Sequence, residues 1–206
     1  MSARQGLARR RGAARIAQVL LAAFLLGAGA LAGAQALAGA PARVPEIRRI
    51  EPGRDEPALG RIESVRAKLP EKYRRRNNFA WAVAKIEGLD KVEYFAHSGI
   101  QRAGDLSTAA TQVVAGASFR PKKKGRFEVL CVNHADEIEG PDCWPRHVDT
   151  EYKIIEDLAA RLPDSSVAGR VRLYTDLYPC ASCRHVMAQF LGAYTNVQLQ
   201  VLYRER

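Results

Sequence analysis

The sequence predicts an α/β domain in which helices pack on a mixed β-sheet. Two strand-like segments separated by a tight turn, 79–86 and 92–96, indicate a hairpin near the start of the domain. Alternating apolar and polar residues predict further strands at 170–175 and 196–203. Long helical segments lie before and between those last strands. The final strand–helix–strand unit is therefore expected to be a right-handed parallel crossover.

The domain is expected to begin with a helix at 61–69. Ile62, Val65 and Leu69 recur there at helical spacing, and Pro70 ends the pattern. The predicted hairpin follows this helix.

The second half of the domain alternates strand and helix signals. We expect a short helix at 109–115, a strand at 127–132 and a loop at 133–147. A helix is predicted at 149–162, where apolar residues form one stripe, and a second at 181–194. Each of these two helices should follow a strand and pack on the sheet.

Composition places the chain among globular proteins. Of its 206 residues 47% are hydrophobic and 26% charged, which excludes a disordered chain. Four cysteines exclude a disulfide-dense scaffold. Residues 1–38 hold five arginines and no acid, so removing them leaves 27 basic and 22 acidic residues and lowers the net charge from +10 to +5. The charge of the body alone does not indicate nucleic-acid binding.

The N-terminal segment 1–38 has the pattern of a secretory signal peptide. Its arginines end at Arg15, an uncharged run follows from Ile16 to Ala42, and Ala36-Leu37-Ala38 is an A-x-A cleavage site. Two alternatives are a mitochondrial presequence and an uncleaved membrane anchor, because 27 uncharged residues can span a bilayer. Cleavage predicts a secreted or periplasmic protein without stable membrane association.

A proline-rich linker is predicted at 39–60, between the leader and the domain. Its four prolines are expected to interrupt any regular element: Pro41, Pro45, Pro52 and Pro57. The folded domain is then expected over 61–206, which is long enough for one hydrophobic core.

Two short motifs at predicted helix starts indicate metal chemistry. Pro179-Cys180-Ala181-Ser182-Cys183 places two thiols at a helix N-terminus, where the helix dipole favours thiolates. A catalytic zinc site needs three protein ligands and an open position. The third ligand is expected from Asp149-Thr150-Glu151, at the start of the other long helix. Glu151 would then face the metal site as a proton shuttle.

These motifs resemble the signature of zinc-dependent nucleobase deaminases, H-x-E followed by P-C-x-x-C. The second half matches in full, whereas Asp149 stands where the signature has histidine. The chain looks like the branch of bacterial secreted toxin deaminases that carries this D-x-E variant. Asn78-Phe79-Ala80 and Ala96-His97-Ser98-Gly99 are also similar to the family, so the resemblance covers about residues 60–206.

The resemblance implies an α/β/α sandwich, a zinc cofactor and a nucleobase substrate in nucleic acid or nucleotide. It implies an exported toxin or effector, which would need an immunity protein in the producing cell. The site residues it implies are Glu151 as catalytic acid/base, Asp149, Cys180 and Cys183 as metal ligands, and Asn78 and Ser98 as substrate contacts.

Other interpretations of the same residues remain open at this point. Asp149 could be only an N-cap, with His147 as the third ligand, or could mark a loss of activity. Glu151 could be a first-turn acid that complements the helix dipole. The C-x-x-C pair could serve an extracytoplasmic thiol–disulfide oxidoreductase. It could also belong to a non-catalytic zinc domain that takes a fourth sulfur from Cys131 or Cys143.

Cys131 and Cys143 flank one loop, so they are expected either to form a disulfide or to remain ordinary thiols. The charge runs Arg74-Arg75-Arg76 and Lys122-Lys123-Lys124 are either solvated or contacts for the phosphates of a polynucleotide.

Overall fold

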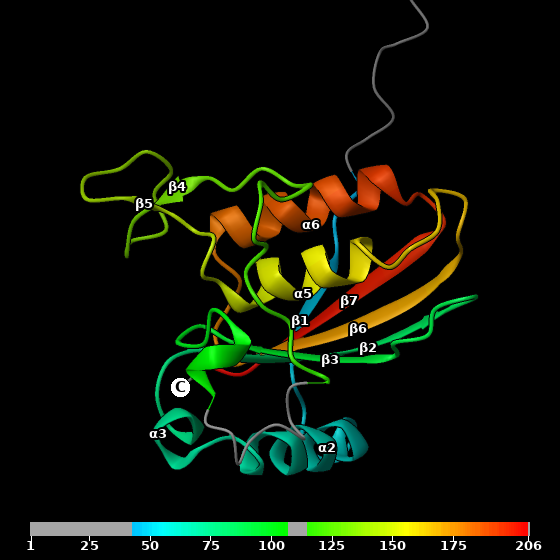
Figure 1. The fold of residues 1–206 in the computed structure, drawn as a ribbon, viewed down its shortest axis with the longest axis horizontal. Helices are drawn as coiled ribbons and strands as arrows, with labels where there is room; N and C mark the ends of the chain where they lie inside the picture. Colours follow the sequence, from blue (N-terminus) through cyan, green and yellow to red (C-terminus); the bar gives the residue numbers. More distant parts are fainter. Residues whose placement is uncertain (1–42, 107–114, 206) are drawn as a thin grey trace, which may run out of the picture. The chain divides into compact units, whose positions relative to one another are not determined.

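The computed structural model describes residues 43–106 and 115–205 of the chain. Within them a five-stranded mixed sheet runs in the order β1-β7-β6-β2-β3 (Figure 1). Its strands are β1 (Glu46–Arg49), β2 (Phe79–Ile86), β3 (Glu93–His97), β6 (Gly169–Thr175) and β7 (Val197–Tyr203). The predicted fold class is confirmed.

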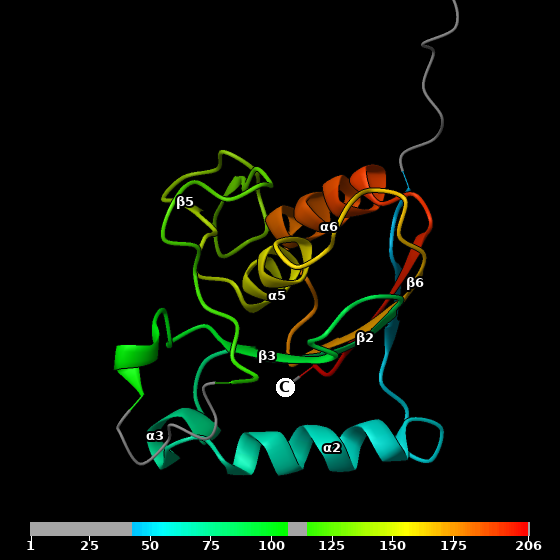
Figure 2. The same ribbon diagram turned by 45° about the vertical axis from the view of Figure 1, so that its right-hand side comes forward.

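Helices cover both faces of this sheet. Helix α2 (Glu56–Ala67) lies on one face, followed by the short α3 (Glu71–Arg74). Helices α5 (Thr150–Ala159) and α6 (Ala181–Ala193) lie side by side on the other face in both views (Figures 1 and 2). The described residues therefore form an α/β/α sandwich, as the resemblance implied. They contain no helix with the length and apolar character needed to cross a membrane.

The directions of the strands decide at which edge of the sheet α5 and α6 begin. β2 pairs antiparallel with both β3 and β6, so β3 and β6 run in the same direction and end at the same edge of the sheet. β6 and β7 are parallel and are joined through α6, which confirms the predicted parallel crossover.

Strand β2, which lies between β6 and β3, carries large residues on one face and small ones on the other. Phe79 and Trp81 belong to the apolar cluster formed with α2. Ala80, Ala82 and Ala84 belong to the cluster formed with α5 and α6. The alternation follows the two-residue period of a strand. Small side chains on the second face leave room for two helices to pack closely against the sheet.

The segment predicted as a linker, 39–60, takes part in the fold from Glu46 onward. β1 pairs in parallel with β7, with Glu46 opposite Gln200, and α2 begins at Glu56. The expectation that prolines exclude regular elements here is wrong for the described residues, because Pro45 directly precedes β1 and Pro52 lies in the turn before α2. Pro57 occupies the first turn of α2, where a missing backbone N–H removes no helical bond.

An ion pair connects β1 to the start of α2. The Arg48 guanidinium donates two hydrogen bonds of 2.7 Å to the carboxylate of Asp55, and the backbone N–H of Glu51 donates a third at 3.0 Å. The hydrogen bonds from Arg48 lower the pKa of Asp55 to about 2. This buried carboxylate therefore stays charged and fixes the turn between the two elements.

The strand predicted at 127–132 is wrong for most of its length. Only Cys131–Val132 form a strand, β4, which pairs with β5 (Trp144–Pro145) in a separate two-stranded sheet. The short helix predicted at 109–115 falls almost entirely on residues outside the described ranges.

Side chains from α5 and α6 account for the course of the segment before β4. The Glu156 carboxylate accepts hydrogen bonds from the backbone N–H groups of Arg126 and Phe127, at 3.0 and 2.8 Å. The Gln189 side chain accepts from the N–H of Glu128 at 3.0 Å. These bonds hold the segment across the two helices, so its N–H groups do not join a sheet ladder.

Cys131 and Cys143 form a disulfide, which decides between the two alternatives for this pair. The bond closes the β4–β5 excursion, the segment of residues 131–145 that contains both strands of the small sheet. Neither sulfur therefore serves as a fourth ligand at the helix starts.

Candidate metal and catalytic site

Helices α5 and α6 begin at the same edge of the sheet (Figure 1). α6 follows β6 directly, whereas α5 is held at the end of β3, where Lys153 of α5 bonds the carbonyl of His97. Since β3 and β6 end at the same edge, the first turns of the two helices meet there. The sequence predicts that a sheet strand at 127–132 positions α5, but β3 is the strand that does so.

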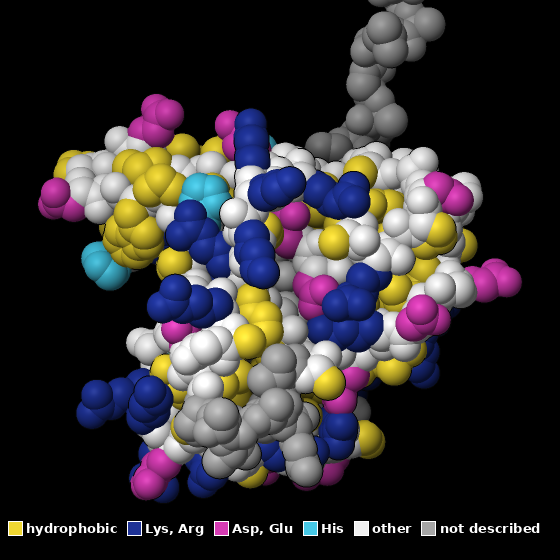
Figure 3. Space-filling view, viewed as in Figure 1, with side chains coloured by type: hydrophobic (Ala, Val, Ile, Leu, Met, Phe, Trp, Pro, Cys, Tyr) yellow, Lys and Arg dark blue, Asp and Glu magenta, His cyan; other side chains and the backbone are white. Residues whose placement is uncertain are grey.

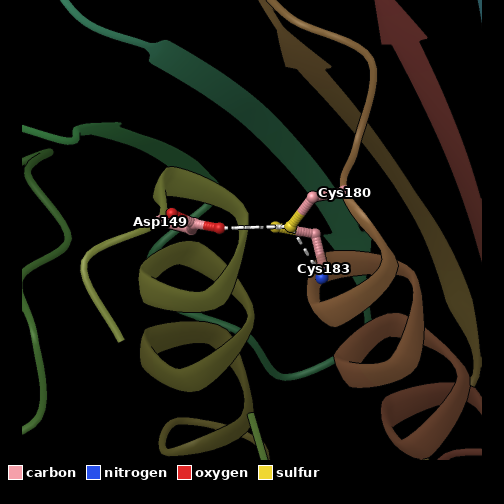
Figure 4. A group of neighbouring side chains, drawn as sticks. All are labelled: Asp149, Cys180 and Cys183. Carbon is pink, nitrogen blue, oxygen red and sulfur yellow. Dashed lines mark hydrogen bonds between the residues drawn. The ribbon is translucent and has the colours of Figure 1, made fainter. Parts of the chain in front are cut away.

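Asp149, Cys180 and Cys183 form a compact cluster at these helix starts. Asp149 is the N-cap residue of α5 and Cys180 that of α6, and their side chains point toward one another (Figure 4). The Asp149 Oδ2 atom lies 3.3 Å from each sulfur, and the sulfurs lie 3.3 Å apart. Asp149 and Cys183 are buried, whereas Cys180 is half-buried. The cluster is thus reached from the Cys180 side.

The donor set of this cluster fits zinc. The three ligand atoms lie within 4.8 Å of one another, and in the described residues this is the group of three such side chains placed to hold one ion. Thiolate sulfur together with a carboxylate oxygen suits zinc, whereas magnesium and calcium prefer oxygen alone. The hydrogen bond with Cys180, burial and the nearby carboxylates raise the pKa of Cys183 well above its ordinary value. A bound cation would offset that cost.

Glu151 lies buried beside the cluster, with its Oε2 atom 3.6 Å from the Cys183 sulfur. Each carboxylate oxygen accepts one hydroxyl bond of 2.8 Å, Oε1 from Thr175 and Oε2 from Thr150. Burial and then the charge of Asp149 raise the pKa of Glu151, and the two hydroxyl bonds oppose that shift. A first-turn acid that only complements a helix dipole would be exposed, so the structure disfavours that interpretation.

Asn78 supports both hydroxyl groups that hold Glu151. Its Nδ2 atom donates to Thr150 Oγ1 at 2.8 Å and to Thr175 Oγ1 at 2.9 Å. Both amide hydrogens are thus used, and each threonine can pass its own hydrogen to the glutamate. The resemblance implied a substrate contact for Asn78, whereas the geometry gives its amide nitrogen a role in orienting Glu151.

Ser98 lies next to Asn78 at the open end of the hairpin. Its Oγ accepts from the Asn78 backbone N–H at 3.1 Å, and its own N–H donates to the Asn78 carbonyl at 2.9 Å. Ser98 therefore fixes the backbone of Asn78 at the start of β2, close to the glutamate that Asn78 supports.

His147, the alternative third ligand, does not join the cluster. Its ring packs edge-on against Tyr152, with 5.7 Å between ring centroids. Burial, followed by the charge of Arg120, lowers the pKa of His147. The arrangement favours Asp149 over His147 as the third ligand.

Sequence reasoning missed Arg146 and Lys153, as well as Thr175, whose hydroxyl holds Glu151. Arg146 Nε donates to Asp149 Oδ2 at 2.8 Å, and its guanidinium lies 4.5 Å from the centre of the Trp144 ring. The three-residue spacing between Arg146 and Asp149 was the available signal. No comparable signal pointed to Lys153, a lysine inside an apolar helix stripe.

Lys153 is fully buried under the turn that follows β3. Its ammonium donates to the carbonyls of His97 and Ile100 at 2.9 and 2.8 Å. Burial lowers its pKa to about 7, against the opposing charges of Asp149 and Asp105. The lysine thus holds the backbone just beyond Ser98, at an electrostatic cost.

We expect this cost to give the protein a distinctive pH dependence. The folded-state pKa of Lys153 lies below the unfolded value, so the folded state binds fewer protons between about pH 7 and 10. The free energy of unfolding should therefore rise with pH in this window, by at most about 1.4 kcal/mol per pH unit from this group. Lys153→Met should lack that component. Denaturant unfolding of both proteins at several pH values measures it, and parallel curves would contradict the assignment.

The fold and the site together define a deaminase-like α/β domain with an Asp/Cys/Cys cluster and a buried glutamate. Residues 62–205 match the toxin-deaminase family model described as the BURPS668_1122 family of deaminases. The chain belongs to this family. No curated protein and no solved structure matched the chain. Family membership makes the domain a hydrolytic deaminase of the toxin type and confirms the resemblance drawn from the motifs.

Proposed function

We propose that this protein is an exported, zinc-dependent deaminase that acts on a nucleobase in nucleic acid or nucleotide. The observation that carries the proposal is the position of Glu151. It is buried, held by two threonine hydroxyls, and lies 3.6 Å from the Cys183 sulfur of the three-ligand cluster. A proton shuttle needs this closeness to the reacting groups together with a raised pKa.

Asp149, Cys180 and Cys183 would hold the zinc ion. When bound, zinc would activate a water molecule for attack on the ring carbon that bears the amino group. Glu151 would pass one proton of that water to the ring nitrogen and the other to the departing amine, so that the C–N bond breaks, ammonia leaves and a carbonyl remains on the ring. The hydroxyls of Thr150 and Thr175 keep both oxygens of Glu151 in place during this exchange.

The positive charge of the surface near the site supports the proposal of a polyanionic substrate. Lysine and arginine side chains gather in the middle of one face, over α5 and the segment between Ser118 and Cys131 that crosses it (Figure 3). Lys122, Lys123 and Lys124 belong to that segment. Such a patch attracts phosphates and makes binding weaker as salt is raised.

The test is to expose DNA, RNA and free nucleotides to the purified protein. We expect uracil or inosine at defined positions in base-resolved sequencing of the polymers, or in chromatography of the nucleotides. Metal-stripped protein serves as the control and should regain activity when zinc is added back. Absence of any deaminated base in all three substrates, with zinc bound, would contradict the proposal.

The thiol–disulfide oxidoreductase remains the second candidate function, and the structure gives it less support. Cys180 and Cys183 are free thiols 3.3 Å apart, as a redox pair could be. However, both sulfurs also contact the Asp149 carboxylate, and most of the domain precedes the C-x-x-C motif. A thioredoxin-like fold needs further strands after its motif.

Export is supported by two independent features. The leader has the pattern of a signal peptide, and the Cys131–Cys143 disulfide is typical of proteins that fold in an oxidising compartment. An exported toxin also requires an immunity protein that protects the producing cell.

We expect the mature secreted protein to begin at Gly39. Cleavage after Ala38 follows from the Ala36-Leu37-Ala38 pattern. N-terminal sequencing of the protein from the medium or periplasm tests this. A chain that still begins at Met1 and stays in the membrane fraction would support the anchor instead.

A further inference from the structure

The metal cluster of this chain carries one more negative charge than a histidine-containing site. Metal ligands bind in their deprotonated forms, so Asp149 and two thiolates bring three negative charges to a divalent ion. In the H-x-E signature a neutral imidazole takes the place of the aspartate, and the ligand charges equal the metal charge. An excess charge in a buried site is unfavourable unless a partner offsets it.

Arg146 is placed to offset this charge. Its Nε atom donates to Asp149 Oδ2, the same oxygen that lies 3.3 Å from both sulfurs. A carboxylate oxygen has two lone pairs, so Oδ2 can accept from Arg146 and still face the sulfurs. The two side chains are only 18% and 10% exposed, so water screens the pair weakly.

The position of Arg146 is itself fixed by the β4–β5 excursion. Its guanidinium stacks on Trp144 at 4.5 Å, and Trp144 pairs with Val132 in the two-stranded sheet. The disulfide between Cys131 and Cys143 closes that excursion. Arg146 is therefore anchored from outside α5 and α6, the helices that carry the ligands.

We infer that Arg146 is the positioning residue that makes Asp149 a competent metal ligand in place of histidine. Its guanidinium keeps Oδ2 turned toward the sulfurs and removes the excess charge of the ligand set. This inference rests on the zinc site proposed above. Loss of such a supporting partner typically costs about 10- to 100-fold in metal affinity or activity.

The test is a cycle of zinc-binding measurements on four full-length proteins: wild type, Arg146→Met, Asp149→His and the double variant. Affinity is measured by competition with a chromophoric chelator. Arg146→Met should weaken binding by about 10- to 100-fold in the Asp149 background. In the Asp149→His background the same change should alter affinity by less than about threefold, because the neutral ring has no carboxylate for Arg146 to hold.

Two further measurements test the inference without the histidine variant: the zinc affinity of Arg146→Lys and the absorption spectrum of the cobalt-loaded protein. Lysine keeps the positive charge but lacks the rigid, planar guanidinium, so the zinc affinity of Arg146→Lys should lie between those of Arg146→Met and the wild type. Cobalt-loaded Arg146→Met should keep its thiolate charge-transfer bands while its d–d bands shift, since only the carboxylate ligand is disturbed. Thermal unfolding of the metal-free proteins should show that both Arg146 variants remain folded, with a lower melting temperature for Arg146→Met because Asp149 loses its partner.

Three results would overturn the inference: wild-type zinc affinity in Arg146→Met, an equal loss in the Asp149→His background, or unfolding of both Arg146 variants. Each of these leaves zinc binding by the wild type intact. Failure of the wild type to bind zinc would instead overturn the proposed function, so the two failures are distinguishable.

Discussion

Glu151→Gln is expected to lower the deamination rate by about 10²- to 10⁴-fold, the contribution typical of a positioned acid/base group. Glutamine has nearly the same shape, and the hydroxyls of Thr150 and Thr175 can accept as well as donate, so the side chain should stay in place. Zinc content should not change because Glu151 is not among the ligands. Product formation and elemental analysis are measured on the same protein preparation.

The matched control for this variant is Glu63→Gln. Glu63 is an exposed glutamate of α2, on the opposite face of the sheet from the cluster. It should keep wild-type activity and zinc content. Because burial raises the pKa of Glu151, removing its charge should also leave the metal-free fold at least as stable at neutral pH. Turnover that survives Glu151→Gln would end the mechanism as proposed.

Asp149→Ala is expected to remove both zinc and activity. The wild type should contain one zinc ion per chain. Without Asp149, two sulfurs remain as ligands, which is fewer than the three that catalytic zinc sites use. Elemental analysis after dialysis against a weak chelator measures the loss. This pattern differs from that of Glu151→Gln, in which activity falls while zinc stays.

Asp149→His is the informative companion to that variant. It supplies the ligand of the H-x-E signature at the same N-cap position, so zinc should be retained. If Asp149 were only an N-cap residue, alanine would cost about 0.5–2 kcal/mol of stability and leave zinc in place. Full zinc content in Asp149→Ala would therefore contradict the ligand assignment and favour a different third ligand.

Local sequence patterns predicted those elements in which buried and exposed residues alternate with the period of a strand or a helix. The alternation in β2, β6 and β7 and the apolar stripe of α5 follow the periods of strands and helices. The same patterns did not predict the strand at Glu46–Arg49, and they predicted a strand at 127–130 that the structure does not contain. There the structure depends on partners far along the chain, such as Gln200 opposite Glu46. Carboxamide and carboxylate groups on α5 and α6 likewise take the N–H groups of the second segment.

The residues of the candidate site could be predicted from the sequence alone. Asp149, Glu151, Cys180 and Cys183 were all named from two motifs, because each motif places its residues within one helical turn. Spacing within a turn is a local property, so the residue types and their order were enough to indicate a metal and a proton shuttle.

The contacts that support those four residues became visible only in the folded arrangement. Asn78 reaches Glu151 through Thr150 and Thr175, which come from α5 and β6. Arg146 reaches Asp149 from the disulfide-closed excursion, and Lys153 bonds the turn after β3. These contacts join separate elements through one or two hydrogen bonds each, so they leave no periodic pattern in the sequence. They exist because packing α5 and α6 on one face of the sheet brings the ends of β3 and β6 to both helix starts.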